Sequence, residues 1–180
     1  MNDSPNFAEF SVRQRREGKY LLRSAALIAL YVAFGLLYFL FFTVGPIKVT
    51  PMIALLPLFE WILVFFTWRF TDVEHEYTIA SGTITFADIY ASRTRKVKLE
   101  VRIRDMERIA PLSRAYEDHC RDADITMDFR GTKNTPDGYF FIFRDGGRKV
   151  AVLFEATARA VKLFRFYNPS ATTASTSLRY

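Results

Sequence analysis

The sequence predicts a membrane-embedded helical hairpin followed by a mostly β domain, with seven short strands and one C-terminal helix. Three observations predict this fold class. Two apolar runs lie close together in the first 68 residues, most of the remaining chain alternates polar and apolar residues over short stretches, and its last periodic stretch has helical spacing. We therefore divide the 180 residues into an N-terminal cytoplasmic segment (1–23), a helical hairpin (24–68), a β domain (69–169) and a disordered tail (170–180).

The two apolar runs have the length of membrane-spanning helices. Residues 24–43 carry no charge, and a helix of that length spans about 30 Å, the thickness of a bilayer's hydrocarbon core. Residues 50–68 carry one charge, Glu60, and Gly45 and Pro46 favour a turn between the runs. The alternative is a pair of helices buried in a soluble domain, but so short a chain could hardly enclose two helices that are apolar all round.

The distribution of charge predicts the orientation of the hairpin. The segment before it holds five Lys and Arg residues and the β domain holds many more, whereas the connecting turn holds only Lys48. The positive-inside rule then places both termini in the cytoplasm, in a multi-pass protein of the cell membrane. The net charge of +6 fits an anionic inner leaflet, and we expect no nucleic-acid partner because the basic residues alternate with acidic ones.

The N-terminal segment allows two interpretations. Pro5 and Glu9 fit the first turn of a helix, and Phe7 and Phe10 would then share a face that could lie on the inner leaflet. The alternative is a short cytoplasmic tail whose basic residues keep the hairpin in the membrane. The apolar face is only two aromatic residues wide, so both interpretations stay open.

Seven strands are expected after residue 68, from alternation at a period of two residues. The second of them slips in its alternation after Phe86, which indicates a β-bulge. The third has the cleanest pattern, with Val97, Leu99 and Val101 on one face, and these residues are expected in the core. The expected ranges are 74–80, 83–90, 95–103, 108–112, 124–129, 139–143 and 148–154.

The final element has helical spacing. Ala160, Val161, Phe164 and Tyr167 recur on one face of residues 156–169, Thr157 is placed to cap the helix, and Pro169 ends it. We expect Phe164 to pack this helix onto the strands.

Seven strands followed by a helix resemble the pleckstrin-homology (PH) superfold, in which two sheets form a barrel with one end covered by the helix. The whole chain is similar to a family of small uncharacterised bacterial membrane proteins, in which a two-helix hairpin leads into a bacterial PH-like domain. The stretches that carry this resemblance are EYTIASGTI (76–84), RKVKLEVRIRDMERIAPL (95–112) and LFEATARAVKLFRFYNP (153–169). The resemblance implies a PH-like barrel held at the inner membrane face, and it implies no activity.

Lipid-binding PH domains carry Lys and Arg in and around the first hairpin loop. The first predicted hairpin loop here, residues 80–83, contains no cation. A basic cluster follows instead, formed by Arg93, Arg95, Lys96 and Lys98. We interpret this cluster as a solvated strand face, with non-specific contact to anionic lipid as the alternative, worth up to about 1 kcal/mol per cation.

Glu60 lies near the middle of the second apolar run, where an ionised carboxylate is costly. No Lys or Arg lies in either run to pair with it. Counting back from the turn places Glu60 level with Gly35, with Tyr31 and Tyr38 one helical turn to either side as the hydroxyls within reach. We therefore expect a protonated Glu60 that faces the helix interface or a partner.

Signals of catalysis are weak. The chain has no nucleophile elbow and no phosphate-binding loop, and the adjacent His119 and Cys120 lack a second ligand pair, so we expect no catalytic residue, cofactor or metal. The sequence predicts a non-catalytic, membrane-anchored binding or scaffold module at the inner membrane face, with the lipid bilayer and a protein or second copy as partners. The alternative is an accessory subunit of a larger membrane complex that assembles through the helices.

Overall fold

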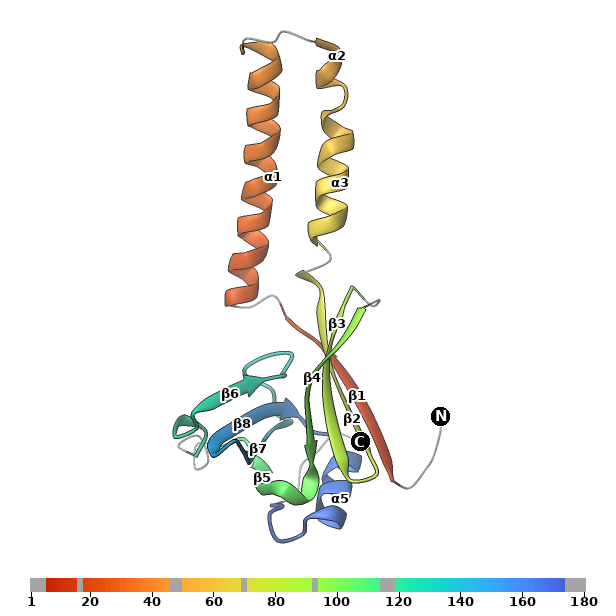
Figure 1. The fold of residues 1–180 in the computed structure, drawn as a ribbon, viewed down its shortest axis with the longest axis vertical. Coiled ribbons are helices and arrows are strands. Elements are labelled where there is room, and N and C mark those ends of the chain that lie inside the picture. The colour runs from red at the N-terminus through yellow and green to blue at the C-terminus, as the bar shows by residue number, and fades with distance from the viewer. Residues whose placement is uncertain are drawn as a thin grey trace. The chain divides into compact units, whose positions relative to one another are not determined.

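The computed structural model describes residues 6–15, 18–45, 50–68, 71–91, 94–113 and 119–173. The chain divides into two compact units, which are described separately. The helical unit is Arg15–Val73, and the β unit combines Met1–Gln14 with Glu74–Tyr180. Figure 1 shows the elements of both units with their labels.

The helical unit contains α1 (Lys19–Thr43), α2 (Thr50–Ile53) and α3 (Leu56–Trp68), and α1 contacts both of the others. In Figure 1, α2 and α3 follow one another alongside α1. The spans Tyr20–Thr43 and Pro51–Trp68 are each long and apolar enough to cross a membrane. Both apolar runs are therefore helical, as predicted.

The second apolar run is interrupted between α2 and α3. The Leu55 N–H donates to the Met52 carbonyl at 3.0 Å, three residues back rather than four, so the helix tightens there. Pro57 is the cause, because it has no N–H to offer the Ile53 carbonyl and its ring disfavours a regular helix at that carbonyl. The predicted second membrane helix is therefore present as two helical segments, α2 and α3.

The β unit contains two four-stranded sheets. Sheet A has the order β1 (Phe7–Arg13), β2 (Val73–Ala80), β3 (Thr83–Tyr90) and β4 (Thr94–Arg102). Sheet B has the order β5 (Met106–Pro111), β7 (Gly138–Asp145), β8 (Arg148–Glu155) and β6 (Ile125–Asp128), with β6 parallel to β8. A 3₁₀ turn, η2 (Ile103–Asp105), joins the sheets, and α5 (Ala158–Tyr167) ends the unit.

The core lies between the sheets and under α5. Sheet A contributes Ile79 and Phe86, sheet B contributes Phe141 and Phe154, and α5 contributes Phe164, all fully buried in one cluster. The described residues form two sheets with eight strands and no closed barrel. The PH-like architecture is confirmed, but the prediction of a seven-stranded barrel is wrong in its strand number and its closure.

The eighth strand is the N-terminal segment, for which the sequence predicted a helix or a tail. Every residue of β1 pairs with β2 in antiparallel register, from Phe7 opposite Ala80 to Arg13 opposite Glu74. The side chains alternate at a period of two, with Ala8, Phe10 and Val12 toward the core. The helical interpretation rested on Phe7 and Phe10, three residues apart, and overlooked this alternation.

The pairing of β1 with β2 changes where the helices lie in the chain. The connection between these two strands is residues 14–72, which contain α1, α2 and α3. The hairpin is therefore inserted into sheet A rather than preceding it. The loop at residues 80–83 is consequently the second strand connection of sheet A, after the helical insertion between β1 and β2. Its lack of cations therefore gives no information about cations at the first connection.

A bulge explains the one mistaken core residue. Phe86 pairs with Leu99 but Ala87 pairs with Val97, so Lys98 is the extra residue on β4. The slip after Phe86 was predicted, but its effect on β4 was not. Since one extra residue between Val97 and Leu99 breaks the alternation, Val97 does not share the buried face expected from the pattern, and it is 50% exposed.

The end of the described chain pairs with β5. The Ile109 N–H donates to the Ala171 carbonyl, and the Thr173 N–H donates to the Ile109 carbonyl, both at 2.8 Å. Residues 171–173, which the sequence placed in a disordered tail, are therefore hydrogen-bonded to β5. Residues 174–180 lie outside the described residues.

The start of α5 is capped as predicted, with one addition. The Thr157 Oγ1 accepts the Ala160 N–H at 3.2 Å, and the buried Tyr77 hydroxyl accepts the Thr157 N–H at 3.2 Å. Burial raises the pKa of Tyr77 to about 12, even though its hydrogen bonds with Thr157 act in the opposite direction. The protonated side chain of Tyr77, on β2 of sheet A, is thus hydrogen-bonded to the start of α5.

We predict that Phe164→Ala destabilises the β unit by about 3–5 kcal/mol, because the side chain is fully buried against Phe154. Phe166→Ala is the matched control, since Phe166 lies on the same helix but is 71% exposed. The control should change stability by about 0.5 kcal/mol or less. Urea unfolding of the full chain in detergent micelles measures both, and equal effects would contradict the docking of α5.

We also predict a Tyr77-dependent loss of stability in alkali. A raised pKa in the folded state favours the protonated phenol, so its contribution is complete below pH 10. It is lost as the pH rises toward 12, by roughly 3 kcal/mol in total. Tyr77→Phe should cost about 1 kcal/mol at neutral pH by removing the bonds to Thr157, yet lose less stability above pH 10. Unchanged pH dependence in urea unfolding of this variant would refute the assignment.

Candidate functional site

Polar and charged groups gather at the two ends of sheet A. The connection end is the end at which Arg13 pairs with Glu74 and Tyr90 pairs with Thr94, and both connections to the helical unit leave from it. The turn end is the opposite end, where Ser81 and Gly82 join β2 to β3. Each end holds a distinct arrangement of side chains.

A chain of polar side chains crosses all four strands near the connection end. Gln14 directly follows β1, and its Oε1 lies 2.8 Å from Nε2 of His75 on β2. The His75 Nδ1 lies 2.8 Å from Oδ1 of Asp88 on β3, whose Oδ2 lies 3.2 Å from Nζ of Lys98 on β4. His75 and Asp88 are buried, so this chain satisfies groups that would otherwise be costly inside the protein.

Asp88 is the charged centre of this row of hydrogen-bonded side chains. Burial raises the pKa of Asp88, but the hydrogen bonds and charges of His75 and Lys98 outweigh burial, and the net pKa lies below its ordinary value. The carboxylate is therefore ionised at neutral pH and attracts both neighbours. In the sequence, the predicted β-bulge was the signal for this group of contacts, because the extra residue of the bulge is Lys98, which pairs with Asp88.

The basic cluster predicted on β4 lies at the same end. Both Nε and Nη2 of Arg95 lie 2.8 Å from Oε1 of Glu76, and Lys98 pairs with Asp88. Lys96 is exposed and makes no ion pair within the described part of the chain. Arg93 lies outside the described residues. Two of the three described cations are thus already neutralised by carboxylates of sheet A.

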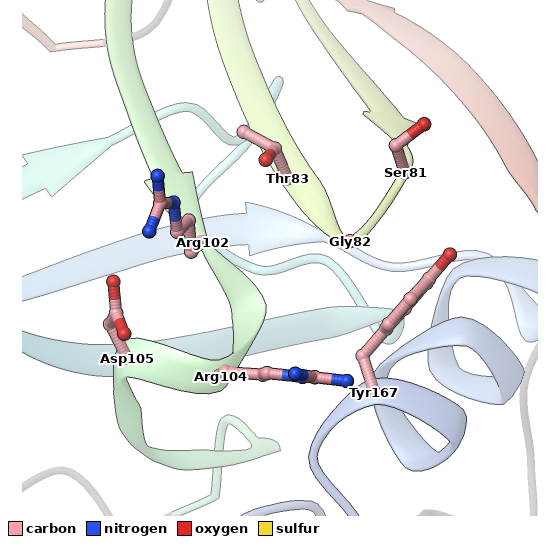
Figure 2. Close-up of a pocket in the computed structure, with 7 residues that line it drawn as sticks. All are labelled: Ser81, Gly82, Thr83, Arg102, Arg104, Asp105 and Tyr167. Atoms are coloured by element: carbon pink, nitrogen blue, oxygen red, sulfur yellow. The ribbon is translucent and has the colours of Figure 1, made fainter.

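The turn end holds a pocket of about 360 Å³. Three elements line it: the β2–β3 turn, the segment from the end of β4 through η2, and the last residue of α5. Figure 2 shows Arg102 and Asp105 on one side, Tyr167 on the other and Arg104 extending toward Tyr167. The lining residues are Ser81, Gly82, Thr83, Arg102, Arg104, Asp105 and Tyr167.

Backbone hydrogen bonds hold the walls of this pocket together. The Ile103 N–H donates to the Gly82 carbonyl at 2.9 Å, which ties η2 to the turn. The Asn168 side-chain amide donates to the Ile103 and Met106 carbonyls, both at 2.9 Å, which ties the end of α5 to η2. The three elements that line the pocket are therefore fixed relative to one another.

The β2–β3 turn approaches Tyr167 closely. Ser81 and Gly82 have φ values of 52° and 80°, the combination of a type I′ hairpin turn. A Cβ added to Gly82 would lie 3.1 Å from the ring of Tyr167, tighter than an ordinary contact. Gly82 is thus required both by its backbone conformation and by the ring beside it. The sequence marked this turn, but not its contact with α5.

Comparison with known families agrees with this architecture. Residues 2–174 match a family model described as Bacterial PH-like domain (DUF6106). The chain belongs to this family. The match is continuous from before β1 to beyond α5, so the inserted helices lie within its length. No curated protein and no solved structure matches the chain.

In this PH-like protein, Glu60 faces α1 at Gly35. A Cβ added to Gly35 would collide with Oε1 of Glu60, so the glycine leaves the space that the carboxyl group occupies. This is the register that counting back from the turn predicted. An interface role for Glu60 with a partner stays a prediction.

The two tyrosines predicted beside Glu60 bond to other groups. The Tyr31 hydroxyl lies 2.6 Å from Oγ1 of Thr67, and the Tyr38 hydroxyl donates to the Met52 carbonyl at 2.8 Å. Tyr38 therefore supports the helix at its break. The first bond joins α1 to α3 and the second joins α1 to α2, and neither bond involves Glu60.

The His119–Cys120 pair occupies a partly buried position between β5 and β6. The His119 Nε2 lies 3.3 Å from Nη1 of Arg108. Among the described residues, no group of three or more His, Cys, Asp or Glu side chains could hold a metal ion.

We predict that Gly35→Ala weakens the pairing of α1 with α3, because the added methyl meets the Glu60 carboxyl. Disulfide formation between Tyr31→Cys and Thr67→Cys, in a Cys120→Ser background, reports this pairing. The rate should fall by less than about tenfold, because the colliding atom is the far end of a flexible side chain and can move aside.

The same change combined with Glu60→Ala provides the control. Removing the carboxyl group should restore most of the cross-linking lost in Gly35→Ala, because the collision is then absent. Additive effects of the two substitutions would show that Gly35 and Glu60 do not meet.

Proposed function

We propose that this chain is a non-catalytic, membrane-anchored binding or scaffold module at the inner face of the cell membrane. The observation that carries the proposal is the insertion of two apolar helices between β1 and β2 of a PH-like sheet. PH-like domains typically bind lipids or proteins and do not catalyse reactions. The helices supply the anchor, and the β unit supplies the binding surface.

The connections support an anchor that keeps the β unit beside the bilayer. Residues 14–18 separate β1 from α1, and residues 69–72 separate α3 from β2. Such connections reach at most about 13–18 Å when fully extended. If the helices cross the bilayer, the connection end of sheet A stays within that distance of the helix ends.

The charge distribution supports a cytoplasmic β unit. The first connection and the start of α1 carry Arg15, Arg16, Lys19 and Arg23, whereas Lys48 is the single cation in the turn between the apolar runs. Short basic segments beside membrane helices remain in the cytoplasm. Both termini then lie inside, and contact of Lys96 with anionic lipid adds a weak, non-specific attraction.

The alternative function is an accessory subunit of a larger membrane complex. Glu60 favours it, because an acidic side chain in an apolar helix is costly unless it meets a partner. Glu60→Gln should then preserve cross-linking to that partner, whereas Glu60→Leu should weaken it. Equal cross-linking of both variants in native membranes would remove the support for this alternative.

We predict that a Lys48→Cys variant, in a Cys120→Ser background, reacts with an impermeant thiol reagent from outside intact cells. The matched control is Arg148→Cys at the β7–β8 hairpin, which should react only after permeabilisation. The reverse pattern of labelling would overturn the orientation. Recovery of the chain in the soluble fraction would overturn the anchor.

A second variant distinguishes the binding-module proposal from the accessory-subunit alternative. Because Arg13 pairs with Glu74, a short turn in place of residues 15–72 should close β1 and β2 into an ordinary hairpin. Circular dichroism and cooperative unfolding check that this soluble variant folds. Cross-linked partners retained by it support the module, and partners lost with the helices support the accessory subunit.

A further inference from the structure

We propose that the pocket at the turn end binds the carboxylate or phosphate group of a soluble ligand. The proposal extends the binding role to a defined site and a ligand class. The anion site rests on the geometry of the β unit alone, and only the choice of a soluble ligand over a lipid head group rests on the proposed membrane anchor.

The charge in the pocket is uncompensated. The side chains of Arg102, Arg104 and Asp105 make no hydrogen bond or ion pair with another described residue. Two guanidinium groups and one carboxylate leave the lining with a net positive charge. Three other arginines of the β unit are instead held by carboxylates: Arg95, Arg130 and Arg144.

The chemistry of the lining fits an anion with planar or tetrahedral oxygens. Guanidinium groups present forked N–H donors that match carboxylate and phosphate oxygens. The Tyr167 ring forms an apolar wall opposite Arg102, as Figure 2 shows. A volume of about 360 Å³ lies at the small end of the range for ligand pockets.

The pocket is built before any ligand arrives. Its three walls are joined by the hydrogen bonds from Ile103 to Gly82 and from Asn168 to η2 and β5. A preformed site avoids the entropy cost of ordering its walls on binding. The exposed side chains of Arg102 and Arg104 are the groups that a ligand would still have to order.

The position of the pocket favours a soluble ligand over a lipid head group. β2 runs eight residues from the connection end to the turn end, a length of about 26 Å. The short connections constrain the connection end, whereas the pocket lies at the other end of the sheet. We therefore commit to an anion in solution and make a lipid head group an outcome of the test.

Protection of arginines from phenylglyoxal tests the proposal. The full chain is placed in nanodiscs of zwitterionic phosphatidylcholine and treated with the reagent at constant ionic strength, with chloride, acetate or inorganic phosphate. Peptide mass spectrometry follows Arg102, Arg104 and the exposed control Arg148. Acetate, phosphate or both should slow modification of Arg102 and Arg104 and leave Arg148 unchanged.

A matched pair of variants tests the forked geometry. Arg104→Lys keeps the charge but loses the fork, so the anion concentration that half-protects Arg102 should rise about tenfold. Arg148→Lys should leave that concentration unchanged. An unchanged thermal melting curve confirms that each exposed substitution leaves the fold intact.

Each remaining outcome decides the proposal. Protection by phosphate alone assigns a phosphate ligand, protection by acetate alone assigns a carboxylate ligand, and protection by both assigns a general anion site. No protection, or equal protection of Arg148, overturns the proposal. Protection only in nanodiscs that contain phosphatidylglycerol assigns a head group and overturns the soluble ligand. These results do not depend on how Lys48→Cys is labelled, so failure here is distinct from failure of the anchor.

Discussion

The antiparallel pairing of β1 with β2 is the constraint on which the other features depend. This pairing brings together two strands that are separated by residues 14–72. The entropy cost of closing such a loop rises with its length, although slowly. Pairing of α1 with α3 brings the two ends of this long insertion together, so the helices contribute to closure of the sheet. A substitution that separates α1 from α3 should therefore also weaken the pairing of β1 with β2, even though β1 is not adjacent to either apolar run in the sequence.

The polar chain from Gln14 to Lys98 follows from the same constraint. Gln14 is the first residue after β1, and it reaches His75 because β1 covers the edge of β2. At the other side, the bulge at Lys98 disturbs the alternation of β4, which exposes Val97 and leaves Lys98 beside Asp88. A buried carboxylate requires such partners, so the irregularity of β4 serves the interior of the sheet rather than its surface.

Most elements could be predicted because their signals are local. The strands from β2 to β8, the cap at Thr157 and the packing of Phe164 each follow from a few neighbouring residues. β1 could not be assigned because its partner lies beyond both helices, and Phe7 and Phe10 fit a helix as well as a strand. The pocket could not be predicted either, since Gly82, Arg104 and Tyr167 meet through the tertiary fold and through the side chain of Asn168.

Comparison of the two ends of sheet A shows why density of charge in the sequence is a poor guide to an anion site. The densest basic stretch, at residues 93–98, contains Arg95 and Lys98, and carboxylates of neighbouring strands already hold both. Arg102 and Arg104 lie in a more balanced stretch, yet they border a hollow in which no described group satisfies them. An external anion gains from cations that are still unpaired, so the turn end rather than the connection end is the stronger candidate for specific recognition.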